Sequence, residues 1–366
     1  MILTRFTASR FRNIGACDLA FSPGVNLFLG ENAQGKTNVL EGIYLFARGK
    51  SFRAATDRDL TKFGESGFSL GVEFQTSARQ ESLGYSFENG SRRREKNGAP
   101  ARLSDMMGRF RAVLFHPEDL QIVKGGPEKR REFLNVALSQ LDPSYIAYYA
   151  RYTKVLENRN ALLKAASKGL PIDRTELEAW SEQLATLACE IYTRRISYLR
   201  DFSPFACGHL RALSAERECL TLTYRRDGGE PGTEDENEYY HTLFLSHWER
   251  EMCAGCTLFG VHRDDLEITV DGKNAKNFAS QGQQRSVILA MKLAEGDCAE
   301  SKSGETPVFL FDDVMSELDD SRRAYLTRRS EGKQLIMTAC ERSIDLGQCY
   351  EIDVKGGNYV PAYRER

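Results

Sequence analysis

The order of apolar and polar residues divides the chain into three parts, and the first part is rich in strand patterns. Apolar residues alternate with polar ones over residues 3–8 and 19–21, and residues 25–29 form a mainly apolar run. Alternation predicts strands with one buried face, and the run predicts a buried strand. Residues 38–48 then change to helical spacing. Further strands are predicted at residues 68–76, 82–88 and 113–115.

The second part, from about residue 127 to residue 213, is poor in glycine and dominated by helical spacing. Helical patterns cover residues 131–138 and 176–199, and the segment 168–171 (Lys-Gly-Leu-Pro) separates them. This arrangement predicts a lobe built on a helical hairpin. The segment is too short for a long coiled coil and lacks sustained heptads.

The third part follows a polar segment. Residues 225–238 contain several glycines and the acidic run 234–238, and they predict an exposed loop. Beyond about residue 257 strand patterns return, and they end in the apolar run 308–311. We therefore expect an α/β domain formed by residues 1–120 and 257–366, with a mainly helical lobe of residues 121–256 inserted between them.

Composition places the chain among globular proteins. Of its 366 residues, 41% are hydrophobic and 28% are charged, which allows two domains with a buried core. No segment approaches the roughly 18 uninterrupted apolar residues of a membrane helix. Residues 1–6 do not resemble a secretory signal. We expect a cytoplasmic protein with no membrane-bound part.

The cysteines and the net charge argue against two classes of protein, zinc-binding proteins and globally basic nucleic-acid binders. Nine cysteines are scattered along the chain, and only Cys253 and Cys256 have CxxC spacing. Because no second pair of this kind could complete a zinc site, we expect reduced thiols. The net charge of −2 excludes a globally basic nucleic-acid binder. A DNA-binding surface would have to concentrate positive charge on one face or be assembled from two chains.

One loop carries the pattern of a phosphate-binding site. It matches G-x-x-x-x-G-K-[ST] at every fixed position, after a predicted strand and before a predicted helix. Glycines let backbone N–H groups point at phosphate oxygens, and the helix N-terminus favours negative charge. We expect Lys36 to contact the β- and γ-phosphates of ATP and Thr37 to hold Mg²⁺. The loop consists of Gly30, Glu31, Asn32, Ala33, Gln34, Gly35, Lys36 and Thr37.

A partner for the metal follows the apolar run 308–311, which ends in Asp312 and Asp313. Asp312 is expected to hold Mg²⁺, as the corresponding carboxylate does in other phosphate-loop enzymes. Asp313 is then placed to orient or deprotonate the attacking water. Acidic residues often end strands, so this pair gains its meaning from the phosphate loop. The two motifs together predict a site that binds and hydrolyses ATP.

The segment before the acidic strand indicates the class of ATPase. Ser280-Gln281-Gly282-Gln283 precedes a helical run and resembles the signature motif of ATP-binding-cassette (ABC) ATPases. Ser280, the Gly282 backbone and the helix dipole predict a second anion site, which in that class faces the γ-phosphate held by the other subunit. Residues 316–319 (Ser-Glu-Leu-Asp) resemble the loop that crosses the same interface. This order predicts a head-to-tail homodimer, and it argues against a P-loop kinase or nucleotidase acting on a small molecule.

The motifs as a set resemble those of the RecF family of bacterial recombination mediators, short relatives of the SMC-type ATPases. The similarity covers most of the chain. In chain order, the motifs nearest the two ends of the set are shared with the wider superfamily. The motifs between them are typical of the RecF family. The segments that carry the similarity are 11–13 (Phe-Arg-Asn), 30–38, 50–53 (Lys-Ser-Phe-Arg), 117–120 (Pro-Glu-Asp-Leu), 124–127 with Arg130 and Arg131, 260–266, 280–285 and 312–319.

The resemblance implies a fold and a function. The fold would be an ABC/SMC-type P-loop ATPase head with an inserted helical lobe in place of a coiled coil. An ATP-dependent homodimer would clamp DNA at single-strand gaps and junctions, and weak, DNA-stimulated ATP hydrolysis would release it. The family works with RecO and RecR to load RecA in DNA repair and replication restart. The resemblance also adds Asn13, Asn38 and Gln283 to the nucleotide-binding residues.

Some positions depart from the pattern of related ATPases. Val261 stands where the family usually has proline, and Thr338 is at the switch position where cassette transporters carry histidine. Gln121 is the candidate for the metal-sensing glutamine. A transporter subunit is disfavoured by the middle motifs and by the arginine clusters. The chain is also too short to carry the added metal-binding domain of the related nucleases.

Basic residues gather in three segments and are candidates for contacts with DNA phosphates, which require only positive side chains on a common surface. A solvated charged face is the alternative for each segment. Residues 92–94 stand beside Asn97 and Gly98 and predict a basic hairpin turn. No zinc-finger or helix-turn-helix pattern is present, so we expect recognition of DNA shape. The candidates are Arg48, Lys50, Arg53, Arg58, Arg92, Arg93, Arg94, Lys96, Arg130 and Arg131.

Overall fold

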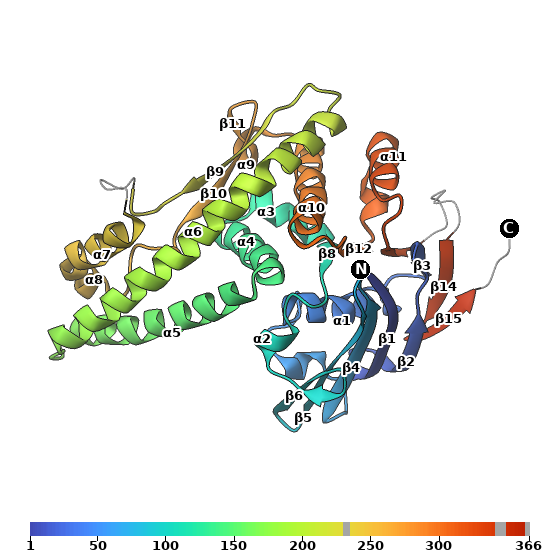
Figure 1. Cartoon of the computed structure of the whole chain (residues 1–366), viewed down its shortest axis with the longest axis horizontal. Helices are drawn as coiled ribbons and strands as arrows, with labels where there is room; N and C mark the ends of the chain where they lie inside the picture. Colours follow the sequence, from blue (N-terminus) through green and yellow to red (C-terminus); the bar gives the residue numbers. More distant parts are fainter. Residues whose placement is uncertain (230–234, 341–348, 363–366) are drawn as a thin grey trace.

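The computed structural model describes residues 1–229, 235–340 and 349–362, and they form a head and a helical lobe (Figure 1). The strands of the N-terminal part and the strands after residue 307 lie together in the head, whereas the strands within residues 265–274 belong to a separate small sheet in the lobe. The long helices of the middle part extend away from it on the left of Figure 1. The predicted architecture, an α/β head with an inserted helical lobe, is confirmed.

The first sheet of the head is antiparallel, with the strand order β2-β1-β4-β5-β6-β7. Leu3, Phe6 and Ala8 of β1 are buried, and a register shift between Leu3 and Arg5 explains why the first two are three residues apart. The strands are β1 (Ile2–Phe11), β2 (Ile14–Ala20), β4 (Gly67–Gln75), β5 (Gln80–Glu88), β6 (Ser91–Lys96) and β7 (Ala99–Pro100).

The second sheet of the head is parallel except at one edge, with the order β15-β14-β3-β13-β12-β8. An early strand, β3, thus lies between two late ones, β13 and β14. Since parallel strands end at the same edge, the loop after β3 and the carboxylates after β12 meet there. The strands are β3 (Val25–Leu29), β8 (Ala112–Phe115), β12 (Val308–Asp312), β13 (Leu335–Ala339), β14 (Cys349–Lys355) and β15 (Asn358–Ala362).

Helix α1 (Lys36–Arg48) lies between the two sheets of the head, and its apolar residues join a core cluster with side chains from both. Helices α10 (Gln281–Ser303) and α11 (Asp320–Arg329) contribute to a second cluster on the other face of the parallel sheet. Strand β3 supplies both clusters, because Phe28 belongs to the first and Leu27 and Leu29 to the second. This alternation holds the start of the phosphate loop in a fixed place.

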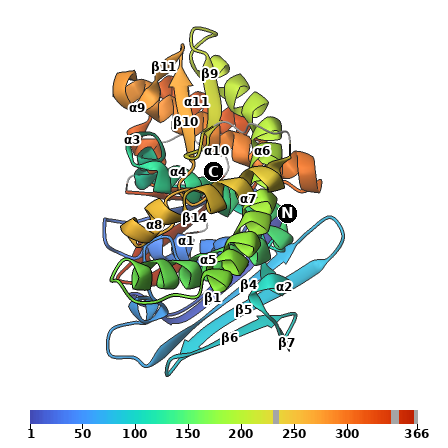
Figure 2. The ribbon, with the colours of Figure 1, turned by 90° about the vertical axis from the view of Figure 1, so that its left-hand side faces the viewer.

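The lobe is built on the antiparallel pair α5 and α6, in which α5 packs against the N-terminal half of α6, and both helices lie above the antiparallel sheet in Figure 2. The predicted break at residues 168–171 falls between them. The longer helices of this part are α4 (Pro127–Leu141), α5 (Pro143–Ala166), α6 (Arg174–Leu213), α7 (Glu236–Ser246) and α8 (Trp248–Ala254). The short elements of the chain are η1 (Asp57–Leu60), α2 (Leu103–Met106), η2 (Pro117–Asp119), α3 (Leu120–Lys124) and α9 (Ala275–Phe278).

The core of the lobe runs across the boundary expected at residue 257. A three-stranded sheet pairs β9 (Leu220–Arg225) with β10 (Asp265–Val270) and then β11 (Lys273–Asn274). Helix α10 packs against α6. One buried cluster therefore extends from Ile122 to Cys298. Helix α10 belongs to this cluster and also to the second core cluster of the head, so it joins the two parts of the molecule.

Two local predictions are wrong. Residues 92–94 lie on strand β6 and pair with β5, so the basic residues are not in a turn. The turns at residues 89–90 and 97–98 flank this strand, because each joins it to a neighbouring strand. Residues 236–238, expected in an exposed loop, begin α7, because the Asp235 side chain accepts from the backbone N–H groups of Asn237 and Glu238. Residues 230–234 of that expected loop lie outside the described residues.

Three further observations concern the exclusions made from the sequence. In the part of the chain that the structure describes, no helix has the length and apolar character needed to cross a membrane. The nine cysteines are free thiols, including Cys253 and Cys256. Within the same described ranges, no group of three or more His, Cys, Asp or Glu side chains has an arrangement that could hold a metal ion.

Candidate nucleotide site

The phosphate loop connects β3 to α1 and has the left-handed backbone that its pattern predicts. The φ angle is 64° at Ala33 and 113° at Gly35. A Cβ atom added at Gly35 would lie 2.7 Å from Asn13 Oδ1, so both the backbone and the available space require glycine. At Gly30 an added Cβ would lie 2.4 Å from the carbonyl oxygen of Val354. The first glycine of the loop is therefore required by the close passage of β14.

Lys36 is buried inside the loop, with 6% of its surface exposed. Its ammonium group donates to the carbonyl oxygen of Gly30 and, at 3.0 Å, to that of Glu31. These contacts fold the side chain back over the loop, where a phosphate-loop lysine reaches the β- and γ-phosphates. The sulfur of Cys340 lies 3.6 Å from the same nitrogen.

Asn13 and Asn38 support the loop from the side of β1 and α1. The Asn13 side-chain amide donates to the carbonyl oxygen of Gln34 (3.1 Å), and Asn38 donates to Asn13 Oδ1 (2.7 Å). Both side chains were assigned to nucleotide binding from the family resemblance. In this structure the two side chains bond to each other and Asn13 bonds to the loop, so they position its backbone; Asn38 Oδ1 also accepts from Arg53 (3.1 Å).

The C-terminal hairpin of β14 and β15 supports the loop from the other side. The backbone N–H of Gly357 donates to the carbonyl oxygen of Gln34 (2.9 Å), and that of Gly356 donates to Gln34 Oε1 (2.6 Å). The hydroxyl of Tyr359 donates to the carbonyl oxygen of Gly35 (3.1 Å). These residues were not found from the sequence, because a lone glycine pair and a tyrosine carry no recognisable signal there.

A group of oxygen atoms lies beside the loop at the end of β12. The Thr37 hydroxyl donates to Asp312 Oδ1 (2.7 Å), and the Thr338 hydroxyl donates to the same oxygen (3.0 Å). Thr338 also accepts from the backbone N–H of Asp313 (2.9 Å). A hydroxyl and a carboxylate oxygen are ligands that Mg²⁺ prefers. The oxygen atoms of Thr37 and Asp312 therefore fit the predicted magnesium site beside the phosphate loop.

We expect Thr338→Val to destabilise the fold by about 1–3 kcal/mol, because the part-buried N–H of Asp313 loses its acceptor and the buried carboxylate of Asp312 loses a donor. Chemical denaturation followed by circular dichroism measures this. Thr338→Ser, which keeps the hydroxyl, should stay near the wild type. Equal stability of the valine variant and the wild type would show that these two hydrogen bonds are not needed.

Cys340 is a residue of this site that sequence analysis did not consider. The proposed switch residue, Thr338, lies beneath Asp312 and is 3% exposed. Cys340 instead faces the loop, where its thiol donates to Asn32 Oδ1 (3.0 Å) and lies near Lys36. The register of β13 beside β3, which pairs Ala339 with Leu29, explains this position, since the next residue on each strand enters the same edge.

Ser280 begins α10 as its N-cap. Its hydroxyl accepts from the backbone N–H of Gln283 (3.2 Å), and Gln283 Oε1 accepts from the backbone N–H of Ser280 (2.8 Å). This is a capping box. The amide group of Gln283 also donates to Glu218 (3.0 Å). The free N–H groups of the first turn and the helix dipole remain available to an anion, so the capping box is compatible with the anion-binding role, which stays a prediction.

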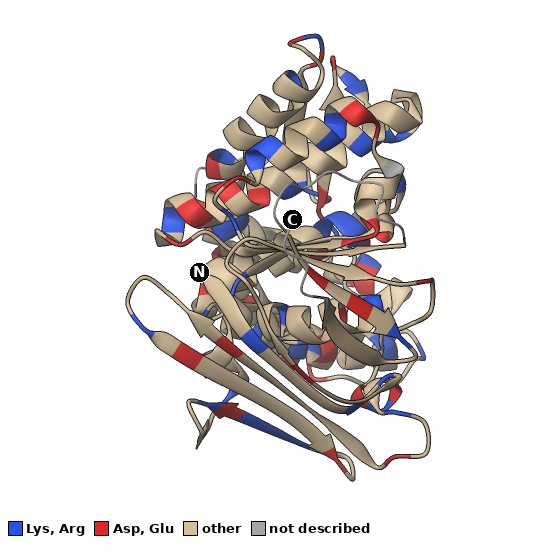
Figure 3. Cartoon of the chain, turned by 90° about the vertical axis from the view of Figure 1, so that its right-hand side faces the viewer, with Lys and Arg blue, Asp and Glu red and all other residues tan. Residues whose placement is uncertain are grey.

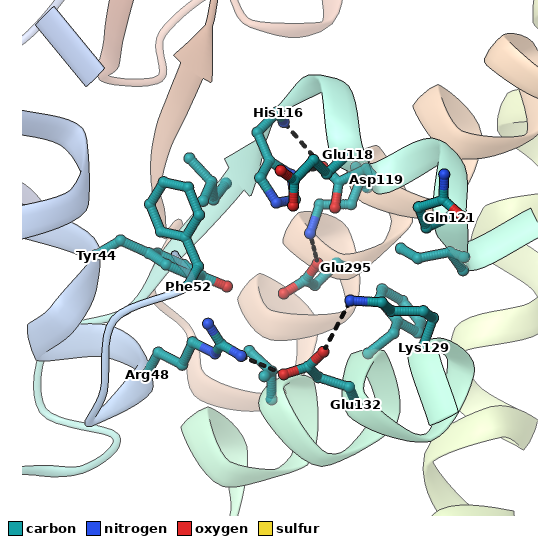
Figure 4. A pocket seen from close by; sticks show the side chains of 15 residues that line it. Tyr44, Arg48, Phe52, His116, Glu118, Asp119, Gln121, Lys129, Glu132 and Glu295 are labelled. Atoms are coloured by element: carbon teal, nitrogen blue, oxygen red, sulfur yellow. Dashed lines mark hydrogen bonds and ion pairs between the residues drawn. The ribbon is translucent and has the colours of Figure 1, made fainter. Parts of the chain in front are cut away.

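Gln121, the candidate metal-sensing glutamine, lies in a separate pocket between α1, α4 and α10 (Figure 4). The loop 30–37 does not line this pocket among the described residues. Arg48 also points into it and pairs there with Glu132 of α4. Nothing in this arrangement connects Gln121 to the oxygen group at Asp312, and its metal-sensing role stays a prediction.

Three of the ten basic candidates for DNA contact lie on α1 and α4 and are held by residues of the lobe. Arg48 is 8% exposed beside Glu132. Arg130 is 9% exposed, and its Nε and Nη2, one edge of the guanidinium group, donate to the two carboxylate oxygens of Asp265. Arg131 donates to the carbonyl oxygen of Asp264 (2.7 Å), and burial lowers its pKa. In this conformation these side chains connect the head and the lobe or support the lobe, and they do not form an open phosphate-binding surface.

The other candidates lie on the head. Asp57, in the segment after α1, forms an ion pair with Arg92 of strand β6. The two segments therefore lie side by side and form one surface, which we call the head basic surface. Basic residues are visible along the edge strands of the antiparallel sheet in Figure 3. The exposed members of the head basic surface are Lys50, Arg53, Arg58, Arg92 and Arg93. Arg94 stacks over Tyr85 and Lys96 pairs with Glu81, so both are partly covered.

Comparison with known proteins agrees with this geometry. Residues 2–346 match the RecF/RecN/SMC N terminal domain. The chain is 40% identical to the "DNA replication and repair protein RecF" of Lactobacillus delbrueckii subsp. bulgaricus (strain ATCC 11842), over 91% of this chain and 89% of that protein. It is 38% identical to the protein of the same name from Geobacillus thermodenitrificans, over 89% of each chain.

Solved structures show the same similarity. A structure described as the recombination mediator protein RecF with ATP in the RecFOR pathway has a TM-score of 0.91 and 32% identity, and the similarity covers 99% of this chain and 98% of that one. An Smc head bound to the C-winged helix domain of ScpA has a TM-score of 0.58 and 13% identity, covering 99% and 97% of the two chains. The second similarity shows the fold alone.

Proposed function

The chain belongs to the RecF family of DNA replication and repair proteins, and we propose that it acts as an ATP-dependent clamp on DNA in recombinational repair and replication restart. Its likeness to relatives of this name over nine tenths of the chain favours this function over a P-loop kinase or nucleotidase. ATP binding is supported by the ATP-bound relative of the same fold.

ATP would be held by residues Gly30–Thr37, with Lys36 on its β- and γ-phosphates. Thr37 and Asp312 would hold Mg²⁺, which would neutralise charge on the phosphate oxygens. Asp313 follows in a left-handed backbone (φ 53°) that turns it away from the strand direction. Its side chain would orient or deprotonate the water that attacks the γ-phosphate. Thr338 orients both carboxylate residues through its hydroxyl.

One observation carries the proposal of a dimer. The first turn of α10, with Ser280, Gly282 and Gln283, contacts Glu218 and α11 of its own chain. Among the described residues it makes no hydrogen bond with loop 30–37 of the same chain. An anion site that does not face its own nucleotide can serve the nucleotide of a second copy. A head-to-tail pair would then enclose two ATP molecules.

We infer the DNA and protein partners from the family. The head basic surface would contact phosphates without base recognition, at single-strand gaps and the adjacent duplex. The solved relative is described as belonging to the RecFOR pathway, which supports RecO and RecR as partners and RecA loading as the outcome. Such a role places the protein in the cytoplasm. Weak ATP hydrolysis, stimulated by DNA, would end the clamped state.

Light scattering of the wild-type chain with and without ATP, and with gapped DNA, tests this function. We expect a monomer without nucleotide, a dimer with ATP, and a dimer that retains gapped DNA. A chain that stays monomeric in every condition while hydrolysing ATP at full rate would contradict the clamp and favour a nucleotidase.

We expect Asp313→Asn to lower ATP hydrolysis by about a hundredfold, because it removes the proposed base, and to prolong the ATP-bound dimer. Asparagine tolerates the left-handed backbone at this position, so the fold should be preserved. Phosphate release and dimer lifetime are the measurements. If the variant hydrolysed ATP normally and dimerised no better than the wild type, another group would have to activate the water.

A further inference from the structure

Arg322 joins the two segments that the proposed dimer would present to its partner. It lies in the first turn of α11, just after the short helix η3 (Val314–Glu317) that follows β12. Its Nε donates to Ser286 Oγ (2.9 Å), and its Nη2 donates to the carbonyl oxygen of Gly282 (3.0 Å). Both acceptors belong to the first two turns of α10. One guanidinium group therefore connects the loop 314–319 to the helix that Ser280 begins.

The guanidinium is held from three directions. Asp319 caps α11 by accepting from the backbone N–H of Arg322 (2.9 Å), and its other oxygen forms an ion pair with Nη1. Ser286 is 2% exposed, and its hydroxyl donates to Gly282 O (3.2 Å) while it accepts from Arg322. The same carbonyl oxygen thus accepts from both Arg322 and Ser286. These contacts to Asp319, Ser286 and Gly282 hold the side chain in one orientation.

Helix stability does not account for this position. A cation near a helix N-terminus opposes the helix dipole, and Arg322 approaches the first turn of α10. The two acceptors on α10 fit the planar fork of a guanidinium group, whose N–H donors point in fixed directions. A lysine ammonium is a point donor and would not match both acceptors and Asp319 at once. Arg322 therefore fixes the position of α10 relative to the loop 314–319, although its charge does not stabilise α10 itself.

We propose that Arg322 is a positioning residue that keeps the signature turn at Ser280 and the loop 314–319 in one rigid arrangement, so that a second copy of the chain engages both together. The proposal rests on the proposed ATP-dependent dimer. If the two segments are held together, the second copy binds both in one step. The γ-phosphate of the partner's ATP then contacts Ser280 while the partner's surface contacts the loop 314–319. Without Arg322, each segment would have to be ordered separately on docking.

The test compares Arg322→Ala and Arg322→Lys with Arg323→Ala. Arg323 is a matched control, because it holds the same loop through Met315 O (2.9 Å) and pairs with Asp320, but it has no hydrogen bond to α10. ATP affinity of the monomer is measured by calorimetry, and the dimer dissociation constant in ATP is measured by sedimentation. We expect Arg322→Ala to weaken the dimer by between about tenfold and a hundredfold with unchanged ATP affinity.

The lysine variant should remain weak, and Arg323→Ala should stay within about threefold of the wild type, below the effect of one charged hydrogen bond. A double-mutant cycle of Arg322→Ala with Ser286→Ala should be non-additive, because both changes remove the same contact. If Arg322→Ala proves unstable on heating, Arg322→Lys and Ser286→Ala provide the same readout.

Four results would overturn the inference while leaving the clamp intact: a normal dimer constant for Arg322→Ala, full rescue by lysine, equal effects at positions 322 and 323, or additivity in the cycle. A wild-type chain that does not dimerise with ATP would contradict the proposed function itself, and this inference with it. The two failures are thus separated by the wild-type measurement.

Discussion

Replacement of Lys36 by alanine is expected to weaken ATP binding by at least about a thousandfold, roughly 4 kcal/mol. The ammonium group is buried in the loop and held by the carbonyl oxygens of Gly30 and Glu31. Charge-assisted hydrogen bonds to two phosphates in such a site are among the strong polar interactions of proteins. Without Lys36, both the charge and the donors are lost.

Calorimetric titration with ATP measures the effect of Lys36→Ala, and thermal unfolding without nucleotide shows whether the fold survives. Lys50→Ala is the matched control, because Lys50 is an exposed lysine just beyond the other end of α1. It should bind ATP like the wild type. Binding by Lys36→Ala within a few-fold of the wild type would mean that the nucleotide does not lie on this loop.

Ser280→Arg is expected to abolish the ATP-dependent dimer while ATP still binds to the monomer. Ser280 is the N-cap of α10 and makes no hydrogen bond with its own phosphate loop among the described residues. A long side chain there would fill the space that a second copy's γ-phosphate must enter. We expect the dimer constant to weaken by at least about a thousandfold, beyond the range of light scattering at micromolar protein.

Ser280→Ala distinguishes the loss of the α10 N-cap from a steric block of the dimer interface. Loss of the cap costs about 1 kcal/mol of stability, and Ser280→Arg loses the same cap. If both variants lost the dimer equally, the N-cap itself would be the cause. If Ser280→Arg formed a normal ATP-bound dimer, the signature turn would lie outside the interface, and the head-to-tail arrangement would be wrong.

Local patterns predicted the elements that carry the nucleotide site. The change from strand to helix spacing around residues 30–37 was correct, because the loop, β3 and α1 are adjacent in sequence. The strand before Asp312 was also correct, since a continuous apolar run between two other strands is buried on both faces. The acidic run after Asp235 was misread as a loop, because acidic residues favour both solvent exposure and a helix N-terminus.

Contacts between distant segments could not be predicted. Arg48 and Arg130 looked like members of a basic surface, yet their partners Glu132 and Asp265 lie 84 and 135 residues away. Cys340 escaped notice for a related reason, since its approach to Lys36 depends on how β13 aligns with β3. Charge patterns in a sequence give no information on which charges meet.

The place of β3 in the parallel sheet has a consequence for how the protein is made. This strand is finished by residue 29, but its neighbours β13 and β14 begin at residues 335 and 349. The same late segment supplies Gly356, Gly357 and Tyr359 to the phosphate loop. During translation the loop is therefore synthesised early and completed late. A chain still being translated therefore lacks part of the support of the phosphate loop, and we expect the complete nucleotide site to form only after the ribosome has produced the last strands of the head.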